Sequence, residues 1–164
     1  MALVALQRSE LAVPSLLYFL AAYMVGNVAA FGVVVALRGR TKRDDYRGLA
    51  RQRPFLSAVL AVSFLTFIGI PPLAGFAAKL LLFSVTIDTG YVWLAVLAVV
   101  NTVVSVFYYA RFLAPMYFAP LEGRVATPSR WSSLAAAAAG VAVLAVGIAA
   151  EPFVRAFSTA RLLP

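Results

Sequence analysis

The chain has 164 residues, of which 63% are hydrophobic and 12% are charged, and its mean hydropathy is +0.94. Soluble domains are about 45–50% apolar and about 25% charged, so this composition predicts an integral membrane protein. The absence of cysteine and histidine excludes disulfides, thiolate chemistry and histidine-based metal or acid–base sites, and the net charge of +8 is interpreted as a topology signal with no nucleic-acid partner expected.

The first predicted element follows a short N-terminal segment. The six apolar residues from Met1 are too few for a signal peptide, so we expect them to end an element that starts earlier, and the chain to be a fragment. The uncharged stretch 11–37 is long enough to span a membrane as one helix. Within it, Tyr23 and Asn27 are one helical turn apart and share a face.

The connection at residues 38–53 is strongly basic. Seven of the fourteen Lys and Arg residues fall there, opposed only by Asp44 and Asp45. Those two acids lie among arginines and the other four are scattered, so no carboxylate metal site is expected.

The second predicted span, residues 54–87, is interrupted near its middle. Pro71 and Pro72 lack the backbone N–H and clash with the preceding turn, so they predict a break in the helix. Gly69 and Gly75 on either side permit the backbone geometry that a break needs. We therefore predict two half-helices, at about 55–69 and 73–87, joined by an unwound link that cannot face lipid.

Lys79 is the only charge in this second span, and apolar residues continue beyond it to Ile87. An ionisable residue inside a membrane indicates an ion or proton pathway, and broken helices are typical of ion sites in transporters. Lysine suits proton exchange because its pKa responds to burial and neighbouring charge, whereas arginine does not deprotonate. The alternative is that Lys79 lies near the membrane surface and extends its ammonium group to water.

The third and fourth predicted spans are residues 91–117 and 131–150. Gly140 and Gly147 on the fourth define a close-packing face without functional meaning. Polar residues that recur at helical spacing are candidate relay partners of Lys79, although hydrogen bonding between helices is their more common role: Tyr23 and Asn27, Ser63 and Thr66, and Asn101, Ser105 and Tyr108.

The basic residues also predict an orientation. Four spans place loops 38–53 and 119–130 on one side, with ten positive charges once Arg111 is counted, against three on the other side at Arg8, Arg155 and Arg161. By the positive-inside rule both loops are cytoplasmic and both termini lie outside.

Four quoted stretches carry a family resemblance: SLLYFLAAYMVGNVAAFG at 15–32, RDDYRGLARQRP at 43–54, FIGIPPLAGFAAKLLLF at 67–83, and YVWLAVLAVVNTVVSVFYYARFLAPMY at 91–117. They resemble the C-terminal region of the subunit N family of bacterial NADH-quinone oxidoreductase (respiratory complex I), called subunit 2 in chloroplasts and mitochondria. The DDYRGLA loop followed by GIPPxAGFxxK is the specific combination.

The resemblance implies an antiporter-like membrane-arm subunit of about fourteen spans, of which this chain covers the last four or so. Family members are held to move protons along buried lysines, driven by quinone reduction elsewhere, and Lys79 matches the lysine of the second repeat. Ala78 stands where the family commonly has glycine, which we expect to stiffen the second half-helix. The missing repeat implies either a truncated or a separately encoded subunit, which would not conduct protons alone.

The implied partners are the other membrane-arm subunits, the missing N-terminal part and the lipid of a bacterial inner membrane. The chain would be part of a translocase without a redox site of its own: it has no cysteine and no GxGxxG motif, and NAD and quinone would act elsewhere. Two alternatives stay open. One is a subunit of a multisubunit sodium/proton antiporter or membrane-bound hydrogenase. The other is a non-transporting four-helix anchor, which predicts an unbroken second helix and no cavity beside Lys79.

Overall fold

The computed structural model describes residues 11–38, 40, 42–120 and 129–158, and this part of the chain is helical without strands. The all-α membrane fold predicted above is confirmed. The elements are α2 (Ala12–Ala36), η1 (Arg43–Tyr46), α3 (Leu49–Gln52), α4 (Pro54–Ile68), α5 (Ala74–Asp88), α6 (Val92–Phe118), α7 (Arg130–Ile148) and α8 (Ala150–Ser158).

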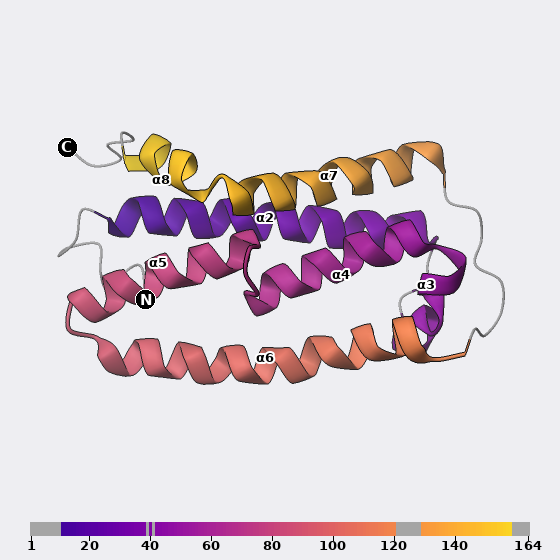
Figure 1. The fold of residues 1–164 in the computed structure, drawn as a ribbon, viewed down its shortest axis with the longest axis horizontal. Helices are drawn as coiled ribbons and strands as arrows, with labels where there is room; N and C mark the ends of the chain where they lie inside the picture. Colours follow the sequence, from indigo (N-terminus) through magenta and orange to yellow (C-terminus); the bar gives the residue numbers. More distant parts are fainter. Residues whose placement is uncertain (1–10, 39, 41, 121–128, 159–164) are drawn as a thin grey trace.

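The long helices run side by side, with α2 packed between α7 and the α4–α5 pair and with α6 at the edge against α4 and α5 (Figure 1). Among the described residues, the three helices α2, α6 and α7 are long and apolar enough to cross a membrane, and α4 is a shorter apolar helix. The number of membrane crossings stays a prediction.

Small residues let α2 and α7 approach closely. A Cβ at Gly32 would lie 3.4 Å from the Cα of Ala136, so the backbones almost touch there. Tyr18 is fully buried and donates a hydrogen bond to the Val146 carbonyl at 2.8 Å, which ties the same two helices together further along. The edge helix α6 packs less closely than α2 and α7, because only Ala95 and Met116 on it are buried.

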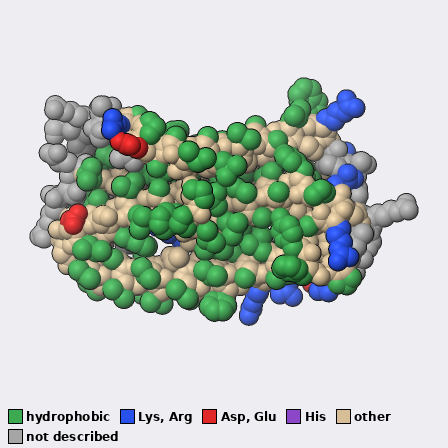
Figure 2. All heavy atoms as spheres, in the orientation of Figure 1, with side chains coloured by type: hydrophobic (Ala, Val, Ile, Leu, Met, Phe, Trp, Pro, Cys, Tyr) green, Lys and Arg blue, Asp and Glu red, His purple; other side chains and the backbone are tan. Residues whose placement is uncertain are grey.

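The described part of the basic loop folds into η1 and α3 at one end of the bundle, opposite the α5–α6 turn (Figure 1). The Gly48 N–H donates to the Pro115 carbonyl at 3.0 Å, and the Tyr46 hydroxyl donates to the Arg40 carbonyl at 2.8 Å. Lys and Arg side chains gather at this end of the molecule (Figure 2). Several predictions made above lie outside the described residues, namely those on Met1, Arg8, Arg161 and most of loop 119–130.

Candidate site at the broken helix

The second predicted span is discontinuous, as the double proline predicts. Helix α4 ends at Ile68 and α5 begins at Ala74, with the prolines in the link between them. Gly69 has φ 88°, in the left-handed region that non-glycine residues rarely adopt, and it ends α4. The four-helix anchor predicts an unbroken helix here, so the break argues against it.

Two glycines allow neighbouring helices to pack closely around the break. A Cβ at Gly75 would lie 1.7 Å from the Thr66 carbonyl oxygen, so the first turn of α5 presses directly against the last turn of α4. A Cβ at Gly147 would lie 2.6 Å from the Ala74 nitrogen and 2.7 Å from the Pro72 oxygen. Helix α7 therefore packs directly on the link. Gly147, for which the sequence predicts only a role in helix packing, lies at the break.

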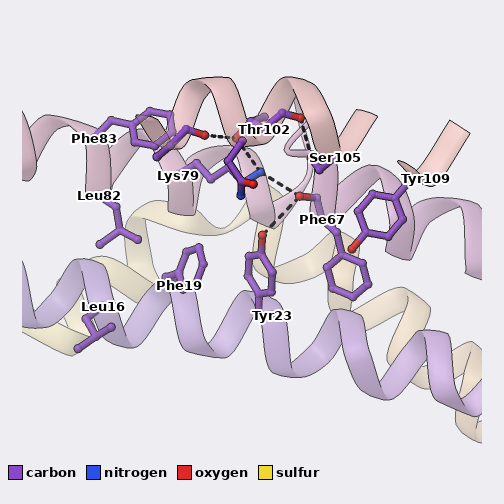
Figure 3. A pocket seen from close by; sticks show the side chains of 12 residues that line it. Leu16, Phe19, Tyr23, Phe67, Lys79, Leu82, Phe83, Thr102, Ser105 and Tyr109 are labelled. Carbon is purple, nitrogen blue, oxygen red and sulfur yellow. Dashed lines mark hydrogen bonds between the residues drawn. The ribbon is translucent and has the colours of Figure 1, made fainter. Parts of the chain in front are cut away.

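Lys79 projects from α5 onto the end of α4 (Figure 3). Its Nζ donates to the carbonyl oxygens of Phe67 and Ile68, both at 2.9 Å, and to Thr102 Oγ1 on α6 at 3.3 Å. The carbonyl end of a helix carries a partial negative charge, so it stabilises a cation placed there. The ammonium group of Lys79, the only charged residue in the predicted span, therefore lies at the break.

A cavity of about 530 Å³ lies beside Lys79, between α2, α5 and α6. Its apolar wall includes Phe19 and Phe83, and its polar groups include Tyr23 and Asn101. Figure 2 shows the hollow, with a Lys or Arg side chain visible inside it. A half-buried ammonium group beside a partly polar cavity is able to exchange a proton with water or a hydroxyl that enters it.

Three of the predicted relay residues line this cavity: Tyr23, Asn101 and Ser105. The Tyr23 hydroxyl donates to the Phe67 carbonyl at 3.4 Å, so it shares an acceptor with Lys79 (Figure 3). Ser105 donates to the Thr102 carbonyl at 2.6 Å within α6.

The other four predicted residues do not line the cavity. Three of them donate to carbonyl groups of their own helices: Asn27 to Tyr23 at 2.7 Å, Ser63 to Val59 at 2.9 Å and Thr66 to Val62 at 2.8 Å. The fourth, Tyr108, is 61% exposed and contacts the rings of Tyr109 and Phe112. The hydrogen bonds of Asn27, Ser63 and Thr66 stay within their own helices, whereas Asn27 and Tyr108 also line a second cavity of about 310 Å³.

Sequence analysis missed two α6 residues that the structure brings to the site, Thr102 and Tyr109. With Ser105 they follow i, i+3, i+7 spacing, which is as good a helical stripe as the predicted Asn101, Ser105, Tyr108. The two stripes share Ser105, so periodicity alone does not choose between them.

The described residues contain no group of three or more His, Cys, Asp or Glu that could hold a metal ion. The residues that line the cavity include no carboxylate either. Lys79 is therefore held by backbone and hydroxyl oxygens within the described structure.

A family described as "NADH:quinone oxidoreductase/Mrp antiporter, TM" matches residues 1–105. The chain belongs to this family. Subunit N of NADH-quinone oxidoreductase from Mycobacterium sp. (strain JLS) is 46% identical over 147 residues, which cover 88% of this chain and 31% of the relative. Subunit N of F(420)H(2) dehydrogenase from Methanosarcina mazei is 45% identical over 115 residues, covering 68% of this chain and 23% of the relative.

The fold is similar to that of a chain in a solved structure. A chain of respiratory complex I from Thermus thermophilus, in a structure with bound aureothin, superposes with a TM-score of 0.80 at 30% identity, covering 90% of this chain and 36% of that one. The chain spans between about a fifth and a third of the length of the curated relatives it matches.

Proposed function

We propose that this chain supplies a proton-carrying lysine, Lys79, to the membrane arm of an NADH-quinone oxidoreductase, which couples quinone reduction to proton pumping. The observation that carries the proposal is the position of the Lys79 ammonium group, at the broken end of α4 and beside a cavity of about 530 Å³. Intramembrane ionisable residues and discontinuous helices both favour an ion pathway.

The polar groups near Lys79 define one side of a pathway. Thr102 contacts the ammonium group, Tyr23 shares its Phe67 acceptor, and Asn101 and Ser105 line the cavity. We propose that these hydroxyl and amide groups, with water, pass protons to and from Lys79. We leave Asn27, Ser63, Thr66 and Tyr108 out of this proposed pathway, because they do not line the cavity beside Lys79.

The proposed partners are the other membrane-arm subunits and the lipid bilayer. Similar subunits N come from both NADH-quinone oxidoreductase and F(420)H(2) dehydrogenase, and we propose the first because its match covers 88% of this chain against 68% for the second. The chain contains no cysteine to hold an iron–sulfur cluster, so we propose that NAD and quinone act in other subunits. A sodium/proton antiporter subunit is the second candidate, since the family description includes Mrp antiporters.

The test uses the complete complex that carries this chain, in membrane vesicles, with proton pumping and electron transfer measured together. We expect Lys79→Leu to abolish pumping through this subunit. Lys79→Arg keeps the charge but cannot release the proton, so we expect it to lower pumping as well. The matched control is Lys42→Leu, which changes the chain's other lysine, an exposed one in the basic loop.

A wild-type ratio of protons to electrons in Lys79→Leu would contradict the proposal. A dependence of pumping on sodium, in place of protons, would favour the antiporter candidate instead. Electron transfer should fall together with pumping if the two steps are tightly coupled.

We also propose a bacterial inner-membrane location in which loops 38–53 and 119–130 are cytoplasmic and both termini lie outside. The gathering of positive side chains at one end of the bundle supports this orientation (Figure 2). Because the chain lacks cysteine, single exposed positions can be labelled with a membrane-impermeant thiol reagent in whole cells. We expect Asp88→Cys to be labelled and Asp44→Cys to be protected, and the reverse pattern would overturn the orientation.

A further inference from the structure

The last two carbonyl groups of α4 lack the donors that a continuous helix would provide. In an α-helix the N–H of residue i+4 donates to the carbonyl of residue i, so Phe67 and Ile68 would pair with positions 71 and 72. Both positions are proline, which has no N–H. The double proline therefore removes the helical donors of two neighbouring carbonyls, and both of these residues are buried.

Lys79 supplies donors to the same two carbonyls from the next helix. Its Nζ lies 2.9 Å from each of the Phe67 and Ile68 oxygens, and Thr102 Oγ1 is a third acceptor at 3.3 Å. A lysine ammonium group has three N–H donors, so donors and acceptors match in number. The Thr102 hydroxyl itself donates to the Ala98 carbonyl at 2.9 Å, which leaves its oxygen to accept from Lys79.

The route of the Lys79 side chain past the break is shaped by Gly69. A Cβ on Gly69 would lie 3.1 Å from Cδ and 3.6 Å from Cε of Lys79, so any larger residue would crowd the lysine stem. The same glycine has the positive φ that ends α4. Gly69 thus ends the helix and also leaves room for the Lys79 side chain, which donates to the carbonyl groups at the end of α4.

We propose that the oxygens of Phe67, Ile68 and Thr102 form a binding site for an ammonium-type cation, which Lys79 fills with its own side chain in place of the N–H groups missing from Pro71 and Pro72. This role goes beyond the proposed function, because the site holds the break together whether or not Lys79 exchanges protons. Truncation of Lys79 to alanine would open the site onto the adjacent cavity of about 530 Å³. A free ammonium ion has four N–H donors, enough for the three oxygens that Nζ contacts, and takes the position of Nζ there.

The test measures amide hydrogen exchange in the full chain in lipid nanodiscs, by mass spectrometry of peptides that cover the end of α4. The reporters are the Gly69 and Ile70 amides, which both donate to the Leu65 carbonyl, at 2.9 and 3.1 Å. We expect Lys79→Ala to speed their exchange about tenfold, because the Ile68 carbonyl loses the donor from Lys79 and the Phe67 carbonyl keeps only the longer hydrogen bond from the Tyr23 hydroxyl, at 3.4 Å. Ammonium chloride at about 100 mM, well above the dissociation constant of a weak site, should restore most of the protection.

Two controls separate hydrogen bonding from general effects of salt and charge. Tetramethylammonium has the same charge as ammonium but no N–H, so we expect it to give no protection. Lys42→Ala should leave exchange at these amides unchanged in every salt. Equal protection by both cations, or none by ammonium, would overturn the proposal.

A second variant decides the case in which Lys79→Ala does not fold in any salt. Pro71→Ala with Pro72→Ala restores two backbone N–H groups, so we expect the loss caused by Lys79→Ala to be at least several-fold smaller in that background. Purely additive effects of the lysine and proline substitutions on the yield of folded protein would overturn the proposal.

Discussion

Pro71-Pro72 and Pro115 are two proline sites that remove backbone donors from apolar stretches of this protein, and of these two only the first lies where a helix ends. Pro71 and Pro72 stand between α4 and α5, where the chain leaves the helix for five residues. Pro115 lies inside α6, which continues to Phe118. Both sites lie in or beside apolar helices, so the outcome depends on the number of donors lost and on the surroundings.

At Pro115 one donor is missing, that for the Arg111 carbonyl, and Arg111 is exposed near the basic end of the bundle. The Pro115 carbonyl accepts from the Gly48 N–H at 3.0 Å and from Ala119 at 3.1 Å, so the rest of the turn is satisfied. At the double proline two neighbouring donors are missing at buried residues. The difference teaches that a single loss at an exposed turn is tolerated, whereas a double loss changes the path of the chain and requires a donor from elsewhere.

The largest expected effect is that of Gly75→Ala, which breaks the site without touching the prolines or the lysine. The added Cβ would lie 1.7 Å from a backbone oxygen, so α5 would have to move away from α4. We expect a loss of more than about 3 kcal/mol, or no folded protein, measured by thermal unfolding in nanodiscs. The control is Gly90→Ala, where the Cβ meets nothing within 4 Å and only the positive φ opposes the change, at a cost of about 1 kcal/mol. Equal stability of Gly75→Ala and wild type would refute the close contact of the two half-helices.

A smaller effect, which tests the contact of α7 with the link, is expected for Gly147→Ala. Its Cβ would lie 2.6–2.9 Å from backbone atoms of residues 72–74, so the substitution should displace the link by steric pressure. Gly140→Ala meets only the side chain of Val59, at 3.2 Å, which can shift. We expect about 2 kcal/mol of destabilisation for Gly147→Ala and less than about 1 kcal/mol for Gly140→Ala. Proton pumping by the complete complex should fall in Gly147→Ala and persist in Gly140→Ala. Similar pumping in the two variants would show that the contact of α7 with the link does not affect the site.

The substitution Thr102→Val tests the contact that α6 contributes to the break. It keeps the shape of the side chain but removes the acceptor for Lys79, so we expect a loss of about 1 kcal/mol and weaker pumping. Ser84→Ala is the matched control, because the Ser84 hydroxyl donates to the Leu80 carbonyl of its own helix and Ser84 does not line the cavity. If Ser84→Ala lowers pumping as much as Thr102→Val, the loss in Thr102→Val does not report on the contact with Lys79.

The smallest effect is expected for Pro115→Ala, which restores the single missing donor at the exposed turn of α6. Because that turn is already tolerated, we expect a change in the free energy of unfolding of less than about 1 kcal/mol, in either direction. Thermal unfolding of this variant beside wild type gives the measurement. A large stabilisation would show that one missing donor costs as much at this site as two do at the break, and the contrast between the sites would disappear.

The sequence by itself determined the local features of this protein. Two adjacent prolines remove two donors wherever they occur, and the flanking Gly69 and Gly75 permit the resulting path, so the break could be located within about one residue of its observed ends. Composition predicted the membrane class, and the short motifs around the break and the basic loop carried the family resemblance that the comparisons confirm. The function of Lys79 in proton transfer stays a prediction.

Only the tertiary structure decided what Lys79 contacts. Helical periodicity limits a residue to a stripe, but it does not tell which neighbouring helix the stripe faces. The contact of Lys79 with Thr102 and the place of Tyr109, not Tyr108, in the cavity wall could therefore not be predicted. The pairing of Lys79 with the carbonyls eleven and twelve residues earlier depends on how α5 folds back against α4, which the close approach at Gly75 permits. The close contact of Gly147 with the link likewise depends on the position of α7. Proline removes a donor wherever it stands in the chain, so this loss can be predicted from the sequence. The group that replaces the donor is selected by packing between helices, and their arrangement cannot be predicted from their separation in the sequence.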